Sequence, residues 1–348
     1  MGGNIKFMSE TKRYDKEDYH TLEHEVINML YASVFNEEGF SGFRKSCVQA
    51  IKAYRTKDSF GDMDVVINSK YLEPNWTDCA IKAFNLSAGD YSKNGNVFSI
   101  AYKNFQIDLI VMSDENFESA LEYYAYNDLG NLVGRLAKRI GVKYGHEGSV
   151  IVVKDNDQVL GEITLSSSTA DIYALLGLDY DTYQNGFETI EDIFKFVTTS
   201  KYFHPDIYLL ENRNASSRER DRKRKTYREF LEYCEAQTFD YVYDYAEKSE
   251  RGGYGVREPF FSNLIVPAYP HVLEEYHTII ARHTKLKLFK EKFNGAICSE
   301  LTGLQSIELG NFTKYAKSRI DEDVVINSSE EEVNALINQL FEDYSLTK

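Results

Sequence analysis

Two apolar stretches of this chain carry aspartates at positions where buried strands are expected. Residues 61–67 read GDMDVVI, and residues 105–111 read FQIDLIV. Runs rich in β-branched residues are typical of buried strands, where a carboxylate costs several kcal/mol unless it is paired or holds a metal. Neither run contains a basic residue. The acids are therefore expected to gather around a cation.

The spacing of these acids predicts a common face. Asp62 and Asp64 point to the same side of a strand, because side chains alternate, and lie roughly 7 Å apart. With Asp108 from a neighbouring strand they form a cluster of three carboxylates. Mg²⁺ prefers oxygen ligands of this kind together with substrate phosphates. The sequence therefore predicts a magnesium site at Asp62, Asp64 and Asp108.

The composition narrows the class of protein. A chain of 348 residues and 40.1 kDa is long enough for two or three units. A net charge of −15 argues against indiscriminate binding to polyanions, so any nucleic-acid contact needs a local basic patch. The four cysteines show no CxxC pair or zinc spacing, and no apolar run approaches the roughly 18 residues of a membrane span. We expect a soluble, cytoplasmic protein without membrane contact.

The spacing of apolar residues predicts the elements around the acidic runs. Residues 19–35 follow a helical face, which the glycines of 39–42 end, and residues 79–86 form a short helix. Lys103 and Asn104 make the tight turn of a hairpin. Strands are expected at 47–54, 63–67, 97–102 and 105–112, a β segment at 149–164, and helices at 115–124, 129–141 and 170–178.

Beyond about residue 187 the pattern changes to long helices rich in tyrosine and charge. The glycines of residues 251–255 predict a flexible loop. Ser328 and Ser329, followed by three glutamates, open a last amphipathic helix that runs through Phe341.

Three segments resemble one known family. Residues 52–67, KAYRTKDSFGDMDVVI, resemble the catalytic motif of the DNA polymerase β nucleotidyltransferase superfamily. Residues 122–148 are similar to the nucleotide-facing segment of family X polymerases, and residues 164–180 resemble the end of that domain. The resemblance implies an α+β (mixed α/β) fold, with a polymerase β-like palm built on a mixed sheet and a mainly helical C-terminal domain. It divides the chain into a catalytic domain at 1–114, a nucleotide-facing subdomain at 115–186 and a helical domain at 187–348.

The resemblance also implies roles for single residues. Asp62 and Asp64 would ligate two Mg²⁺ ions, or Mn²⁺ in their place, and Asp108 would bind the catalytic ion near the attacking 3′-hydroxyl. All three acids are thus expected to be catalytic. Nucleotide-binding roles fall on six residues: Lys52, Arg55, Gly61, Tyr123, Tyr124 and Asn131. Arg55 matches the arginine that holds the triphosphate, because its fork can pair two phosphate oxygens.

Two departures from the family pattern bear on function. The family's Gly-Ser, which helps to hold phosphate, is replaced by Ile51 and Lys52, and Lys52 could supply a compensating charge. About 50 residues precede the motif, fewer than the N-terminal domains of a repair polymerase need. A gap-filling polymerase is therefore not expected.

The C-terminal half adds two clues about the acceptor. Residues 292–319 resemble the helical tail of CCA-adding and related tRNA nucleotidyltransferases. Residues 213–228 hold eight basic residues against two acids, a local charge of +6 that suits a phosphate track. The alternative is the solvated face of an amphipathic helix whose apolar stripe includes Tyr227 and Phe230. The candidate nucleic-acid contacts are Arg218, Arg222, Lys223, Arg224 and Lys225.

These observations lead to one expected activity and three alternatives. The expected activity is metal-dependent transfer of a nucleoside monophosphate from a nucleoside triphosphate to the 3′-hydroxyl of a nucleic acid, with an RNA or tRNA end favoured. One alternative is a family X-like DNA polymerase or terminal transferase acting on DNA ends. The others are nucleotidyl transfer to a protein or small molecule, and nucleic-acid binding without catalysis. The sequence leaves the oligomeric state and the added base open.

Overall fold

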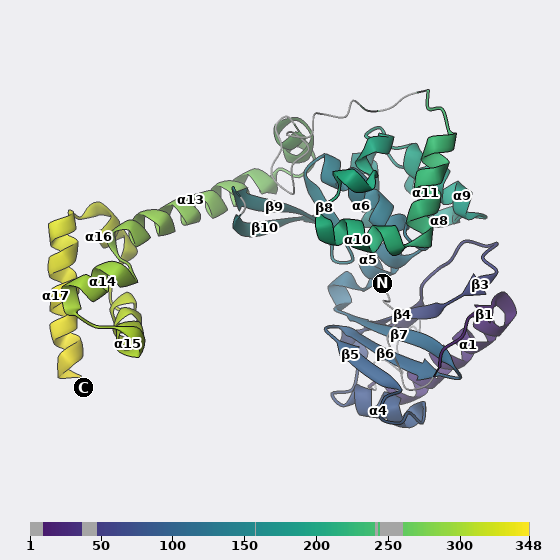
Figure 1. Ribbon diagram of the computed structural model, residues 1–348, viewed down its shortest axis with the longest axis horizontal. Coiled ribbons are helices and arrows are strands. Elements are labelled where there is room, and N and C mark those ends of the chain that lie inside the picture. The colour runs from purple at the N-terminus through teal and green to yellow at the C-terminus, as the bar shows by residue number, and fades with distance from the viewer. Residues whose placement is uncertain (1–9, 37–46, 157, 241–242, 244–259, 348) are drawn as a thin grey trace. The chain divides into compact units, whose positions relative to one another are not determined.

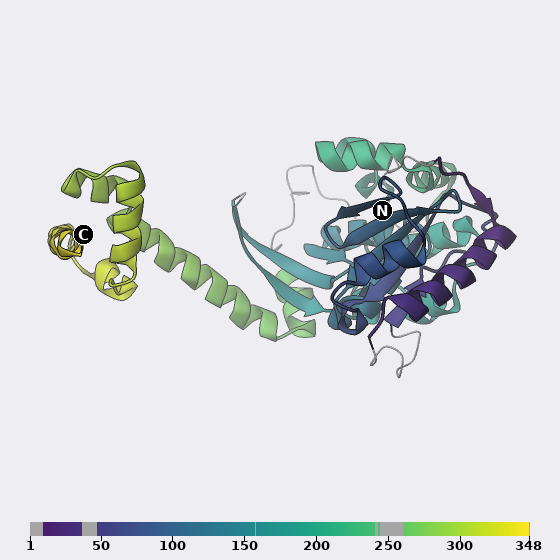
Figure 2. The ribbon, with the colours of Figure 1, turned by 90° about the horizontal axis from the view of Figure 1, so that it is seen from below.

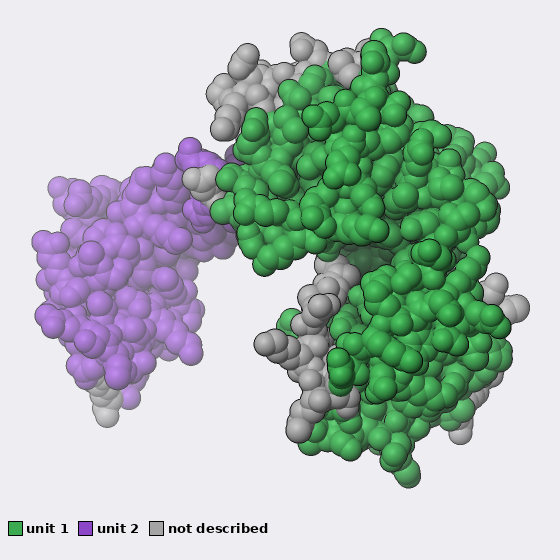
Figure 3. Space-filling model, turned by 45° about the vertical axis from the view of Figure 1, so that its right-hand side comes forward, with its two compact units in different colours: residues 1–152, 162–269 green, residues 153–161, 270–348 purple. Residues whose placement is uncertain are grey.

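A computed structural model describes residues 10–36, 47–156, 158–240, 243 and 260–347. The chain divides into two compact units, shown in different colours in Figure 3. Unit 1 comprises Met1–Val152 and Glu162–Tyr269, and unit 2 comprises Val153–Gly161 and Pro270–Lys348. Residues 187–269, assigned above to the helical domain, group with unit 1. The glycine-rich segments at 39–42 and 251–255 lie outside the described residues.

Unit 1 contains a five-stranded mixed sheet, which lies with α1 (Lys16–Ser33) and α4 (Trp76–Ala83) in one part of the unit (Figure 1). The strand order is β2-β4-β7-β6-β5, in which β4 and β7 are parallel and the other pairs antiparallel. The mixed α and β architecture is thus confirmed. Lys103 and Asn104 adopt φ of 50° and 59°, as a two-residue hairpin turn requires. The strands are β2 Val48–Ala50, β4 Asp62–Asn68, β5 Tyr91–Asn94, β6 Val97–Tyr102 and β7 Phe105–Met112.

The strand predicted at 47–54 is wrong beyond Ala50. The Ile51 N–H still bonds to the Asp64 carbonyl at 3.0 Å, but the chain then leaves the sheet. The Lys52 carbonyl accepts from the Tyr126 N–H at 2.7 Å, and the Arg55 N–H donates to the Phe187 carbonyl at 2.9 Å. These distant partners satisfy the backbone as a strand neighbour would.

Two helices cover one face of this sheet (Figure 1). Helix α1 runs over Lys16–Ser33, and the Asp15 side chain caps its N-terminus by accepting from the Asp18 N–H. Helix α4 runs over Trp76–Ala83, slightly before the predicted 79–86. A further small sheet pairs β1 Tyr14–Asp15 with β3 Ser59–Phe60. The two helices and the sheet share an apolar core, whose fully buried side chains include Val26, Leu30, Val65, Ile67, Phe105 and Leu109.

The rest of unit 1 is mainly helical, with a three-stranded sheet of order β10-β9-β8. The β segment predicted at 149–164 consists of two strands, seen as a long curved hairpin in Figure 2. Residues 153–161 of this hairpin belong to unit 2. The strands are β8 Val142–Gly145, β9 Gly148–Asp155 and β10 Gln158–Ser166. The helices are α5 Phe117–Tyr124, α6 Leu129–Arg139, α7 Thr169–Leu176, α8 Tyr180–Asn185, α9 Ile190–Thr198, α10 Ala215–Lys223, α11 Lys225–Ala236 and α12 Val266–Ala268.

The long helices expected from residue 187 begin only in unit 2. Between α9 and α10 the chain makes 3₁₀ turns at Pro205–Ile207 and Leu210–Asn212. Unit 2 holds five helices among its described residues, packed around Phe289, Phe312 and Ile337. Ser329 and Glu332 form a capping box, which confirms the predicted start of the last helix. The helices are α13 His271–Lys292, α14 Gly295–Thr302, α15 Ser306–Lys317, α16 Glu322–Asn327 and α17 Glu330–Leu346.

Candidate active site

The alternation of side chains along β4 and β7 separates the acids from the main core. Val65, Ile67 and Leu109 point to the face that α1 and α4 cover. Asp62, Asp64 and Asp108 occupy the intervening positions and therefore lie on the opposite face. Further along the same strands, this face is apolar and packs against α5 through Val66 and Ile110.

The parallel register brings the acids of the two strands together. Asp64 lies directly opposite Asp108, and Asp62 lies opposite Gln106. Asp108 is only 3% exposed, and both of its carboxylate oxygens accept from Gln106 Nε2 at 3.1 Å. Three carboxylates thus share one face of two neighbouring strands.

Burial and repulsion from neighbouring carboxylates disfavour negative charge on Asp64 and Asp108. Burial raises the pKa of Asp64 to about 6, and the nearby charges of Asp62 and Asp108 act in the same direction. Burial also raises the pKa of Asp108, although hydrogen bonds from Ser99 and Gln106 oppose the shift. A cation bound between the carboxylates would relieve both effects.

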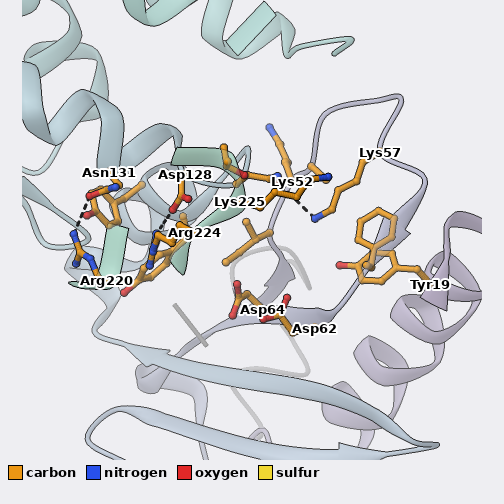
Figure 4. Close-up of a pocket in the computed structure, with 17 residues that line it drawn as sticks. Tyr19, Lys52, Lys57, Asp62, Asp64, Asp128, Asn131, Arg220, Arg224 and Lys225 are labelled. Atoms are coloured by element: carbon orange, nitrogen blue, oxygen red, sulfur yellow. Dashed lines mark hydrogen bonds and ion pairs between the residues drawn. The ribbon is translucent and has the colours of Figure 1, made fainter. Parts of the chain in front are cut away.

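The acidic face opens into a pocket of about 370 Å³ (Figure 4). Asp62 and Asp64 lie side by side in this view, with the basic and amide side chains of the pocket around them. The pocket brings together eight residues predicted from the sequence: Lys52, Asp62, Asp64, Tyr123, Tyr124, Asn131, Arg224 and Lys225. It also contains Lys57, Asp128 and Arg220, which the sequence analysis did not select.

Lys57 contributes a basic side chain to the pocket. Its ammonium donates to Asn127 Oδ1 at 3.3 Å and lies 4.5 Å from the centre of the Phe60 ring. Burial lowers the pKa of Lys57, and the negative charges of Asp62 and Asp64 oppose that shift. Lys57 belongs to the loop between β2 and β3, where no periodic pattern marks a functional position.

The opposite wall of the pocket joins the start of α6 to helices α10 and α11. Arg220 Nη2 donates to Asn131 Oδ1 at 3.0 Å, and Arg224 Nη1 forms a close ion pair with Asp128. Burial lowers the pKa of Arg224, and the charge of Asp64 opposes the shift. Figure 4 shows Arg220 beside Asn131 on α6 and Arg224 beside Asp128, the residue before α6.

The two predicted tyrosines lie in an aromatic cluster at the end of α5. Tyr123 and Tyr124 are in edge contact, with ring centres 5.4 Å apart. Tyr124 is buried and stacks on His146 at 5.6 Å, while Tyr123 meets Tyr144 edge-on at 5.3 Å. Both tyrosines line the pocket, and each also packs against an aromatic side chain outside the pocket lining.

Two predicted nucleotide-binding residues fall outside the described lining of this pocket. Arg55 donates to the Asn185 carbonyl and pairs with Glu188 at 3.5 Å. It lines a neighbouring cavity of about 450 Å³, which shares Lys52 and Lys57 with the first pocket. At Gly61, a Cβ would come within 2.7 Å of Arg13 Nη1, so the glycine leaves room for that guanidinium.

The basic residues of the run at 213–228 lie in several different environments. Arg222 and Lys223 are exposed and pair with Glu219, Lys223 at 2.8 Å. Arg218 donates to the Arg213 carbonyl at 2.9 Å. Of the basic residues of the run, only Arg220, Arg224 and Lys225 are among the described pocket residues. Its apolar stripe is buried at Tyr227, Phe230 and Cys234, as expected for an amphipathic helix.

The donor set of the pocket fits a hard divalent cation. Asp62 and Asp64 offer carboxylate oxygens to the pocket, and Asp108 stands directly beside Asp64. Across the described residues, no group of three His, Cys, Asp or Glu side chains is assembled as a ready metal site. In this conformation Gln106 holds the carboxylate of Asp108.

Comparisons with known proteins leave the family undetermined. No protein-family model matches the chain, and a search of curated proteins finds no match. Within the described part of the chain, no helix has the combined length and hydropathy needed to cross a bilayer. Function must therefore be inferred from the pocket itself.

Proposed function

We propose that this protein is a Mg²⁺-dependent nucleotidyltransferase that transfers a nucleoside monophosphate from a nucleoside triphosphate to the 3′-hydroxyl of a nucleic acid. The observation that carries the proposal is the set of three carboxylates on one face of β4 and β7, beside a pocket lined by basic side chains. Acidic and basic groups facing one cavity suit a phosphate substrate held with a metal. The five-stranded sheet would then serve as a polymerase β-like palm.

The residues of the pocket have distinct roles in this reaction. Asp62 and Asp64 would hold Mg²⁺, with Asp108 next to them near the attacking hydroxyl. Bound Mg²⁺ would neutralise the triphosphate and make the 3′-hydroxyl easier to deprotonate. Lys52, at the position of the family's missing Gly-Ser, and Lys57 both line the pocket with positive charge, so they are candidates for holding the phosphates.

The neighbouring cavity extends this basic surface. Lys52 and Lys57 line both cavities, and Arg55 lines the second. A triphosphate could follow these three side chains away from the carboxylates. Arg55 would have to exchange its contact with Glu188 for phosphate, which is a modest cost because both side chains are more than half exposed.

The acceptor is proposed to be an RNA end, with tRNA favoured. The support for RNA is the resemblance of residues 292–319 to the tail of tRNA nucleotidyltransferases. Arg224, between α10 and α11, and Lys225, the first residue of α11, bring positive charge to the pocket, where a nucleic-acid end would enter.

An acceptor panel tests the proposal. The protein is incubated with each labelled ribo- and deoxyribonucleoside triphosphate, Mg²⁺, and tRNA, single-stranded RNA or DNA primers. We expect label on a 3′ end, with tRNA the best acceptor, and its loss in Asp62→Asn and Asp64→Asn. Asp58→Asn is the matched control, because Asp58 is an exposed acid of the preceding loop.

The same panel separates the alternatives. Label on DNA ends alone would favour a DNA polymerase or terminal transferase. Label on protein would favour a protein-modifying enzyme. Salt-sensitive nucleic-acid binding without nucleotide consumption would favour a binding protein and refute the enzymatic proposal.

A further inference from the structure

Arg220 connects the pocket to a buried charge on α10. Its Nη2 donates to Asn131 Oδ1 at 3.0 Å, and its Nε donates to Asp221 Oδ1 at 3.3 Å. The Arg220 side chain is 48% exposed, whereas Asp221 is fully buried. Arg220 therefore bridges the pocket wall at Asn131 and the interior at Asp221. The guanidinium is therefore held at two points, which fixes its orientation.

The buried end of this connection is firmly anchored. The side chain of Asp221 is fully buried, and it pairs closely with Arg213, whose side chain is 1% exposed. Arg135 Nη2 lies 3.8 Å from the same carboxylate. An acid surrounded by three arginines in the interior has little freedom to move. Asp221 thus provides a rigid support for Arg220.

The contact with Arg220 determines which way the Asn131 amide faces. A guanidinium can only donate hydrogen bonds, so Asn131 must turn its oxygen toward Arg220. The amide nitrogen then remains for the pocket that Asn131 lines. Asn131 Nδ2 is buried and has no hydrogen-bond partner among the described residues. A buried donor of this kind is stabilised when a ligand supplies an acceptor.

We propose that Arg220 is a positioning residue, which presents the Asn131 amide as a hydrogen-bond donor to an acceptor atom of the bound nucleoside. The acceptor is a base carbonyl, a base ring nitrogen or a sugar oxygen. This inference rests on the proposed function and specifies how the same pocket recognises its nucleotide. Asp221 supports Arg220 from the interior, and of these three residues only Asn131 contacts the nucleoside.

Steady-state kinetics and nucleotide binding test this role together. We expect Arg220→Ala to raise the KM for the nucleoside triphosphate about five- to tenfold, with kcat within about twofold of the wild type, as expected for one lost hydrogen bond in binding. A fluorescent nucleoside triphosphate should show the same loss of affinity without turnover. Arg220→Lys keeps a donor and should recover part of the affinity. Arg228→Ala is the matched control, because Arg228 is an exposed arginine on α11 outside the described pocket lining.

Asn131→Asp tests the direction of the hydrogen bond. The aspartate can still accept from Arg220, but it offers the pocket an acceptor in place of a donor. We expect at least a tenfold loss of nucleotide affinity, as large as that of Asn131→Ala. Wild-type affinity in Asn131→Asp would overturn the inference.

The outcomes separate this inference from the proposed function. An active wild type with equal KM values for Arg220→Ala and Arg228→Ala would refute the positioning role alone, and so would a fall in kcat without a rise in KM. A wild type that neither binds nor consumes nucleoside triphosphate would refute both.

Discussion

Replacing Asp221 with Asn should destabilise unit 1 strongly. The substitution keeps the size of the side chain but removes the charge that compensates Arg213. Both side chains are at most 1% exposed, so water cannot take over the role of the carboxylate. Breaking one partner of a buried ion pair costs about 3–5 kcal/mol. The asparagine oxygen can still accept one hydrogen bond, and we therefore expect the free energy of unfolding to fall by about 3 kcal/mol.

Urea denaturation followed by tryptophan fluorescence measures this loss. The chain has a single tryptophan, Trp76, which lies on α4 of unit 1 in edge contact with Phe98. Its fluorescence therefore reports the unfolding of the unit that contains Asp221. Glu219→Gln is the matched control on the same helix, because its partners Arg222 and Lys223 are exposed, and its midpoint should stay at the wild-type value.

A small loss of stability in Asp221→Asn would contradict the role given to the buried ion pair. A loss below about 1 kcal/mol for Asp221→Asn would mean that Arg213 does not depend on the charge of Asp221. Arg213→Met combined with Asp221→Leu should recover at least half of the loss, since apolar residues of similar volume often replace a buried pair without cost. A double variant as unstable as Asp221→Asn would assign the effect to packing.

Three further predictions concern the metal, the phosphates and the core. Mg²⁺ should raise the melting temperature of the wild type and leave that of Asp64→Asn unchanged in a thermal-shift titration, and equal shifts would remove Asp64 from the site. Lys57→Ala should raise the KM for nucleoside triphosphate about tenfold in initial-rate assays, while Lys195→Ala, which changes an exposed lysine on α9, should match the wild type. Leu30→Ala should cost about 2–5 kcal/mol by Trp76 fluorescence, because Leu30 is fully buried between α1 and the sheet, and a loss below 1 kcal/mol would contradict the described core.

The parts of the fold with strict local patterns could be predicted from the sequence. The strands 97–102 and 105–112 match their predicted bounds, because β-branched runs on either side of a two-residue turn leave few alternatives. The alternation of Asp62, Asp64 and Asp108 with apolar residues placed the acids on one face. Their pairing depends on β4 and β7 being neighbours in the parallel register that places Asp64 opposite Asp108.

The features that depend on distant contacts could not be predicted. Residues 51–54 look like a strand, but the Lys52 carbonyl pairs with Tyr126, and the next turn of the chain is held by the bond from Arg55 to Phe187. Arg220 and Asn131 are 89 residues apart, and no local pattern connects them. Residues 213–228 likewise form one basic run in the sequence, which left a phosphate track and a solvated helix face both open, whereas the fold buries Arg213 and directs only part of the run to the pocket.

The central claim is that the carboxylates of β4 and β7 support nucleotidyl transfer. The most direct measurement follows pyrophosphate release and acceptor length in the same reaction, with Mg²⁺ present and then removed by chelation. The account predicts one pyrophosphate for each nucleotide added, and loss of both products on chelation or in the Asp62→Asn, Asp64→Asn double variant. Undiminished products from that double variant, or no extension of any RNA or DNA acceptor by the wild type, would contradict it.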